Sequence, residues 1–249
     1  MIVNILDVLS ILLMLCVLPT VWLVYKKRLK FLNGVFLGTF MFLVSSGCSM
    51  YAQSLLYGLS PGDLLINNVF DSIINAYNSV PEISATEIQT INQLIETLKE
   101  IYSILLPSVL VLGNLLWVYV IFMVSKGILA VFRKDVSGFM KFSELKLPKS
   151  ALFFAVLSYV LSMIFKDSPI SYAFFNFSVI IFMISSVCGL SVIDYAFRKK
   201  IRFSVFRTFI YIVAFFVIRL FTGMGGSVLV LVGITDAIFN FRKIKQDNA

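Results

Sequence analysis

Long apolar runs separated by short polar segments dominate the pattern of this 249-residue chain. Most of the runs reach the roughly 20 residues that an α-helix needs to cross about 30 Å of hydrocarbon. The pattern therefore predicts an all-α polytopic transmembrane helical bundle of about seven spans, of which the fourth and the seventh are short. The predicted spans are Ile5–Val24, Phe31–Leu56, Ile101–Phe132, Ser150–Phe165, Ile170–Ala196, Phe203–Phe221 and Gly226–Phe241.

The segment between the second and third spans, residues 59–100, is acidic, with Lys99 as its one basic residue. We expect it to be an extracytoplasmic amphipathic segment within a single membrane domain, 1–249. It would contain a short helix around Leu64–Tyr77 and a second helix from about Thr86 that runs into the third span. The second helix is predicted because apolar residues recur at helical spacing: Ile88, Ile91, Ile95, Leu98 and Tyr102. Such a segment would either form a flap on the outer surface or over the bundle, or serve only as a connector.

Basic residues alternate between the connections in the way that orients membrane proteins. Four clusters hold 18 of the 21 Lys and Arg residues, after the first, third and fifth spans and after the last. The pattern predicts a multi-pass protein of the cell membrane with its N-terminus outside and its C-terminus in the cytoplasm. It also makes the last two spans a hairpin, because two basic clusters flank them. The clusters are Lys26–Lys30, Lys126–Lys149, Arg198–Arg207 and Arg242–Lys245.

Composition agrees with this assignment and narrows the chemistry. Hydrophobic residues make up 59% of the chain and charged residues 14%, against roughly 45–50% and 25% in soluble domains. The chain has no histidine, its three cysteines lack metal-ligand spacing, and it contains no nucleotide-binding or hydrolase motif. We therefore expect no enzyme, no metal and no cofactor. The net charge of +8 lies in clusters between apolar spans, which predicts contact with the lipid bilayer and no nucleic acid.

Four polar residues within the spans are the candidates for ligand binding, because polar groups in hydrocarbon are costly. Asn114 and Asn176 would either bond across helices or face a ligand. Asp236 would be a cation or proton site, or the partner of a nearby basic residue. Arg219 would extend to the head groups or attract an anionic ligand. Gly34-xxx-Gly38 in the second span indicates close packing within the chain.

Short motifs in this chain resemble the YybS-like family of bacterial multi-pass membrane proteins, whose function is unknown. That family is similar in fold to the substrate-capture subunits of energy-coupling factor importers, so the resemblance implies a transporter-like architecture without established binding residues. The motifs are Leu106-Pro107, Asn114, Lys146-Leu-Pro-Lys149, Asn176, Gly189-Leu-Ser191, Gly233-Ile-Thr-Asp236 and Phe241-Arg242-Lys243.

Two functional hypotheses follow. The first is a transporter-like or small-molecule substrate-capture subunit without its own ATPase, which would work with an energising ATPase module or another membrane protein. The alternative is a non-transporting membrane scaffold or regulatory protein that recruits partners through its basic cytoplasmic loops. The contact face would then include Lys134, Lys141 and Lys146.

Overall fold

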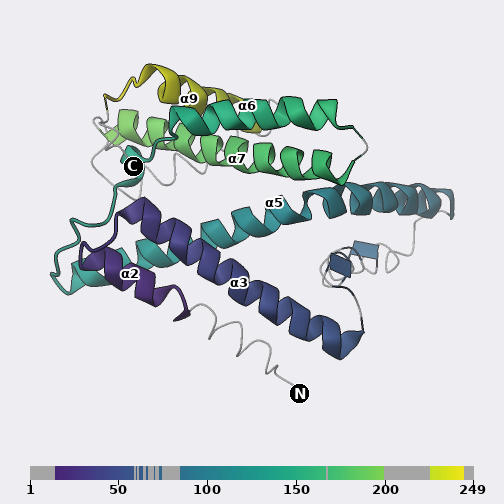
Figure 1. The fold of residues 1–249 in the computed structure, drawn as a ribbon, viewed down its shortest axis with the longest axis horizontal. Helices are drawn as coiled ribbons and strands as arrows, with labels where there is room; N and C mark the ends of the chain where they lie inside the picture. Colours follow the sequence, from purple (N-terminus) through teal and green to yellow (C-terminus); the bar gives the residue numbers. More distant parts are fainter. Residues whose placement is uncertain are drawn as a thin grey trace. The chain divides into compact units, whose positions relative to one another are not determined.

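The computed structural model describes residues 15–58, 85–166, 168–198 and 225–243, with a few single positions between 60 and 74. Every regular element within these residues is a helix, which confirms the all-α prediction (Figure 1). The elements are α2 (Leu18–Tyr25), α3 (Phe31–Tyr57), α5 (Ala85–Val131), the 3-10 helix η1 (Phe142–Glu144), α6 (Lys149–Ile164), α7 (Pro169–Arg198) and α9 (Gly225–Phe239).

Three of these helices, α3, α5 and α7, are long and apolar enough to cross a membrane. Helices α6 and α9 are apolar but have 16 and 15 residues, which is about 24 and 22 Å at about 1.5 Å per residue. They correspond to the two spans that were predicted to be short. The start of the first predicted span, most of Leu64–Tyr77 and the whole sixth span, Phe203–Phe221, lie outside the described residues.

Helices α2, α3 and α5 belong to the first of two compact units, Met1–Gly138. Two glycines let α3 approach its neighbours closely. A Cβ at Gly34 would overlap Val24 of α2, and one at Gly38 would lie 3.1 Å from Val118 of α5. The predicted role of this glycine pair in packing within the chain is confirmed.

Helix α5 is much longer than a membrane span. Its 47 residues extend about 70 Å, against a hydrocarbon thickness of about 30 Å. This single helix confirms the prediction that a helix from about Thr86 runs into the third span. Pro107 lies inside α5 and lacks the N–H for one helical hydrogen bond; the helix bends along its length (Figure 1). In its first half, the Tyr102 ring packs edge-on against Phe70 with centroids 5.9 Å apart.

The connection after α2 and the segment after α5 meet at one end of the first unit. Lys27 Nζ lies 2.8 Å from Asp135 Oδ2. The Lys27 ammonium and the amide and hydroxyl of Ser137 hold the pKa of the Asp135 carboxyl well below its usual range. A Cβ at Gly138 would lie 2.6 Å from the Val24 carbonyl oxygen. These contacts place both connections on the same side of this unit.

The second unit, Phe139–Ala249, contains η1, α6, α7 and α9. Serine hydroxyls of α7 donate to backbone carbonyls of both neighbouring helices: Ser178 to Ala155 at 3.0 Å and Ser185 to Val230 at 3.3 Å. Such bonds satisfy polar groups within an apolar bundle and hold its helices together. The apolar core beside them consists of Leu147, Leu152, Ala155, Ile181, Cys188 and Ala237.

Helices α7 and α9 are in backbone contact where they cross. A Cβ at Gly189 of α7 would overlap the Leu229 carbonyl of α9, and a Cβ at Gly233 of α9 would overlap the Ser185 carbonyl of α7. The absence of a side chain at each glycine allows this approach. The crossing fixes the two helices relative to each other just before their polar C-terminal ends.

Candidate functional site

An ion pair between Asp236 and Arg242 is buried at the C-terminal end of α9. Arg242 Nη2 lies 2.8 Å and Nε 3.1 Å from Asp236 Oδ2, and each side chain is 2% exposed. The helix ends at Phe239, and Asn240 adopts a φ of 51°. This turn brings Arg242 back to the helix end, where the helix dipole also favours a cation. The predicted pairing of Asp236 with a nearby basic residue is confirmed.

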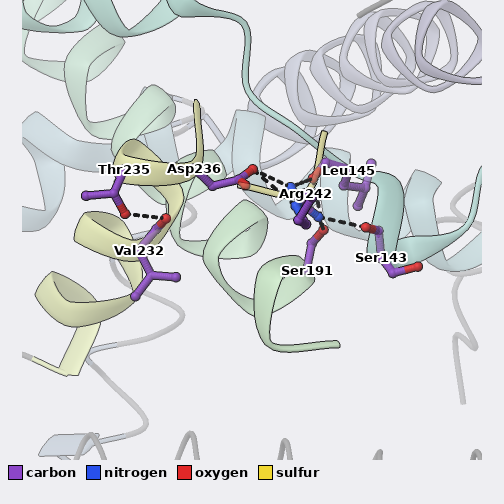
Figure 2. A network of polar contacts seen from close by, with 7 residues as sticks. All are labelled: Ser143, Leu145, Ser191, Val232, Thr235, Asp236 and Arg242. Carbon is purple, nitrogen blue, oxygen red and sulfur yellow. Dashed lines mark hydrogen bonds and ion pairs between the residues drawn. The ribbon is translucent and has the colours of Figure 1, made fainter. Parts of the chain in front are cut away.

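All five N–H groups of the Arg242 guanidinium donate hydrogen bonds (Figure 2). Besides the two bonds to Asp236, Nη1 donates to the Ser143 carbonyl at 2.7 Å and to the Ser191 hydroxyl, and Nη2 donates to the Leu145 carbonyl at 2.7 Å. Because a guanidinium has five donors, none remains for a ligand. We call Arg242 and the four residues that accept its bonds the arginine clamp: Ser143, Leu145, Ser191, Asp236 and Arg242.

The arginine clamp joins three parts of the second unit. Ser191 comes from α7, Asp236 from α9, and the two carbonyls from the connection between α5 and α6. Two further bonds strengthen the attachment: Ser191 Oγ donates to the Leu145 carbonyl at 2.9 Å, and Arg198 Nη1 donates to Ser143 Oγ at 3.2 Å. The connection is therefore held at two carbonyls and one hydroxyl.

The clamp also gives the direction of the two crossing helices. Ser191 follows Gly189 closely in α7, and Asp236 follows Gly233 closely in α9. Both residues reach Arg242 on the same side of the crossing. Helices α7 and α9 therefore run parallel.

Lys146 lies beside the clamp and is half-buried. Burial lowers the pKa of its ammonium, the Asp236 carboxylate opposes that shift, and Arg242 adds to it. The neighbouring Lys141 is exposed and lies 3.5 Å from Glu144. Of these two predicted contact residues, Lys141 is accessible to a partner, whereas Lys146 belongs largely to the surroundings of the clamp.

None of the remaining predicted site residues takes part in the hydrogen bonds of the clamp given above. Asn114 belongs to the first unit, where its side-chain oxygen accepts a bond from Ser46 Oγ at 3.5 Å between α5 and α3. Asn176 donates to the Tyr172 carbonyl, one turn earlier in α7, at 2.8 Å. It precedes Ser191 by about 22 Å of helix, so it does not share a site with Asp236. Lys134 is exposed in the first unit, and Arg219 lies outside the described residues.

Several clamp residues belong to short motifs of the sequence, but Asp236 is the only one of the five clamp residues that was a predicted site residue. The motifs that carry the family resemblance include Gly189-Leu-Ser191, Gly233-Ile-Thr-Asp236 and Arg242. In the folded chain, the two glycines form the crossing of α7 and α9, and the three polar residues meet beyond it. These three motifs of the family resemblance therefore belong to one packed region of the second unit.

Apolar helices joined by buried hydrogen bonds, with charged groups paired at their ends, define a multi-pass α-helical membrane protein. Within that class, the chain belongs to the family described as "Predicted membrane protein (DUF2232)", which matches residues 1–237. The match is consistent with the YybS-like resemblance. It includes Ser191 and Asp236 and ends before Arg242. No curated protein and no solved structure matches the chain.

Proposed function

We propose that this protein is a membrane-embedded docking protein that recruits a partner through the basic cytoplasmic connection between α5 and α6. The observation that carries the proposal is the arginine clamp, which holds the backbone of that connection at Ser143 and Leu145. A fixed backbone lowers the conformational entropy lost on binding, so it favours recognition by a preorganised surface. Exposed lysines, including Lys141, lie along the same connection.

The hypothesis of a substrate-capture subunit receives less support from the geometry. It rests on the family resemblance and on polar residues within spans. Asn114 is bonded across two helices, as expected for a residue that stabilises helix packing, and the amide of Asn176 donates to a carbonyl of its own helix. A copurifying ATPase pair together with ligand-dependent thermal stabilisation would favour the capture subunit over the docking protein.

Crosslinking in native membranes tests the docking proposal. A photo-crosslinking amino acid in place of the exposed Ser150 would report what lies against the connection. Replacing both exposed lysines, Lys134 and Lys141, by Gln is expected to lower the yield of the protein crosslink about fivefold, because charges at the rim of an interface contribute modestly each. Lys146 is left unchanged because it lies beside the clamp.

A matched variant replaces Lys99 and Lys166, which the charge pattern assigns to the outer side, by Gln. Its crosslink yield should equal that of the unmodified protein. A crosslink to lipid alone, or an equal yield from all three proteins, would contradict docking through this face.

We also propose seven crossings with the N-terminus outside and the C-terminus in the cytoplasm. Two structural observations support this topology. The Lys27–Asp135 pair joins two connections that the charge pattern assigns to the cytoplasm. Parallel α7 and α9 require the chain to return between Arg198 and Gly225, and the apolar run Phe203–Phe221 is long enough to do so.

Reporters that are active in only one compartment test this topology. Fused after Met1, an alkaline phosphatase reporter should be active and a cytoplasmic fluorescent reporter dark; fused after Lys243, the result should be reversed. Cytoplasmic signal at both ends would mean an even number of crossings and would overturn the seven-span arrangement.

A further inference from the structure

The C-terminal end of α2 carries a cluster of aromatic and cationic side chains in the first unit. Lys26 Nζ lies 5.9 Å from the centroid of the Trp22 ring and 5.5 Å from that of Tyr25, and Arg28 Cζ lies 5.9 Å from the Trp22 centroid. These distances are within the range of cation–π attraction. Two cations are therefore positioned over one indole ring.

Local backbone structure explains why Arg28 reaches this ring. The Lys27 amide donates to the Val24 carbonyl and the Arg28 amide donates to the Leu23 carbonyl, both at 2.9 Å. With Lys27 at a φ of 55°, this is a Schellman ending of the helix. It folds the chain back, so that Arg28 returns towards Trp22 instead of continuing away from it.

The charges of Lys26 and Arg28 are not neutralised by any acidic side chain in the described part of the chain. Lys27 between them differs, since it forms an ion pair with Asp135 at 2.8 Å. Contact with an aromatic face orders a long side chain but leaves its positive charge intact. The pair of cations is thus preorganised and available to an anion.

The exposed apolar face before the cluster indicates what kind of anion fits. Leu18 and Trp22 of α2 are 47% and 51% exposed and lie one turn apart on one face, and Leu15, just before α2, is 51% exposed. In a membrane helix such a face contacts acyl chains, and an interfacial tryptophan marks the level of the head groups. A ligand at this place would contact an apolar surface along Leu15 and Leu18 and two cations at the C-terminal end of α2.

We propose that Trp22, Lys26 and Arg28 form a binding site for the phosphate head group of an anionic phospholipid in the cytoplasmic leaflet. The phosphate lies between the Lys26 ammonium and the Arg28 guanidinium, and the acyl chains lie along Leu15 and Leu18. Trp22 orders the two cations and packs against the glycerol region of the lipid.

Quenching of tryptophan fluorescence by brominated lipids tests this site. The chain has two tryptophans, so Trp117→Phe leaves Trp22 as the reporter. In nanodiscs, the apparent affinity of the Trp22 site, measured by fluorescence quenching, is expected to be about tenfold higher for brominated phosphatidylglycerol than for brominated phosphatidylcholine. Lys26→Gln and Arg28→Gln should each lower this preference about fivefold, the contribution expected from one basic residue at a membrane surface.

Lys27→Gln is the matched control, because it removes the same charge from the neighbouring position. It should keep the preference of the parent protein. Equal quenching by the two lipids in the parent would overturn the site. If Lys27→Gln lost as much of the lipid preference as Lys26→Gln, the preference would come from unspecific surface charge and the site would also be overturned. Inorganic phosphate added to phosphatidylcholine nanodiscs should leave Trp22 emission unchanged; a saturable response would identify a free anion as the ligand and overturn the lipid assignment.

Discussion

Arg242→Ala is expected to destabilise the protein by about 3–5 kcal/mol, because it leaves a buried carboxylate without its counter-ion. Asp236 would lose its counter-ion and two hydrogen bonds at a position that is 1% exposed, and the carbonyls of Ser143 and Leu145 would each lose a donor. The measurement is thermal unfolding of the detergent-solubilised protein, followed by circular dichroism. Limited proteolysis should also cleave the connection between α5 and α6 faster.

Lys243→Ala provides the control, because it removes the same charge from the adjacent, exposed position. It should leave the unfolding temperature within error of the parent. The double variant Arg242→Met with Asp236→Leu should be less destabilised than Arg242→Ala, since it leaves no buried charge without a partner. If Arg242→Ala and Lys243→Ala unfold alike, the clamp makes no contribution to stability.

Gly233→Ala is expected to destabilise the second unit by about 3 kcal/mol, at the upper end of the costs of overpacking a core. The added Cβ would overlap the Ser185 carbonyl, which belongs to a helix backbone and can move only if α7 and α9 separate. Separation would also lengthen the bond from Ser185 Oγ to the Val230 carbonyl. The same thermal unfolding experiment measures the effect.

Gly113→Ala and Gly127→Ala are the matched changes in α5, where a Cβ would meet nothing within 4 Å. Alanine loses less backbone entropy than glycine on forming a helix, so each should stabilise the protein by up to about 1 kcal/mol. The two kinds of glycine should therefore give effects of opposite sign. If Gly233→Ala stabilised the protein, the crossing of α7 and α9 would have room for a Cβ and the close approach at Gly233 would be wrong.

Periodic and local features were predictable from the sequence. Apolar runs located the described α-helices but not η1, and apolar residues at helical spacing indicated that α5 begins near Thr86, because both signals depend only on neighbours along the chain. The close packing at Gly34 and Gly38 was predictable for a similar reason: two small residues one turn apart make a flat face on a helix. None of these inferences required knowledge of what lies opposite.

The arginine clamp was predictable only in part. An ion pair for Asp236 followed from the cost of a charge in hydrocarbon, but its partner is six residues away and reaches it only because the chain turns after Phe239. The bonds from Arg242 to Ser191 and to the Ser143 carbonyl join residues 51 and 99 positions apart. No periodicity encodes such contacts, since they depend on how α7 and α9 cross.

The long separation within the clamp also sets an order of events during synthesis. Ser143 leaves the ribosome 99 residues before Arg242, a delay of roughly 5–20 s at about 5–20 residues per second. During that interval the carbonyls of Ser143 and Leu145 lack the guanidinium as a donor. The clamp can therefore close only after Arg242 has been synthesised, and it then joins Ser191 of α7, Asp236 of α9 and the carbonyls of Ser143 and Leu145.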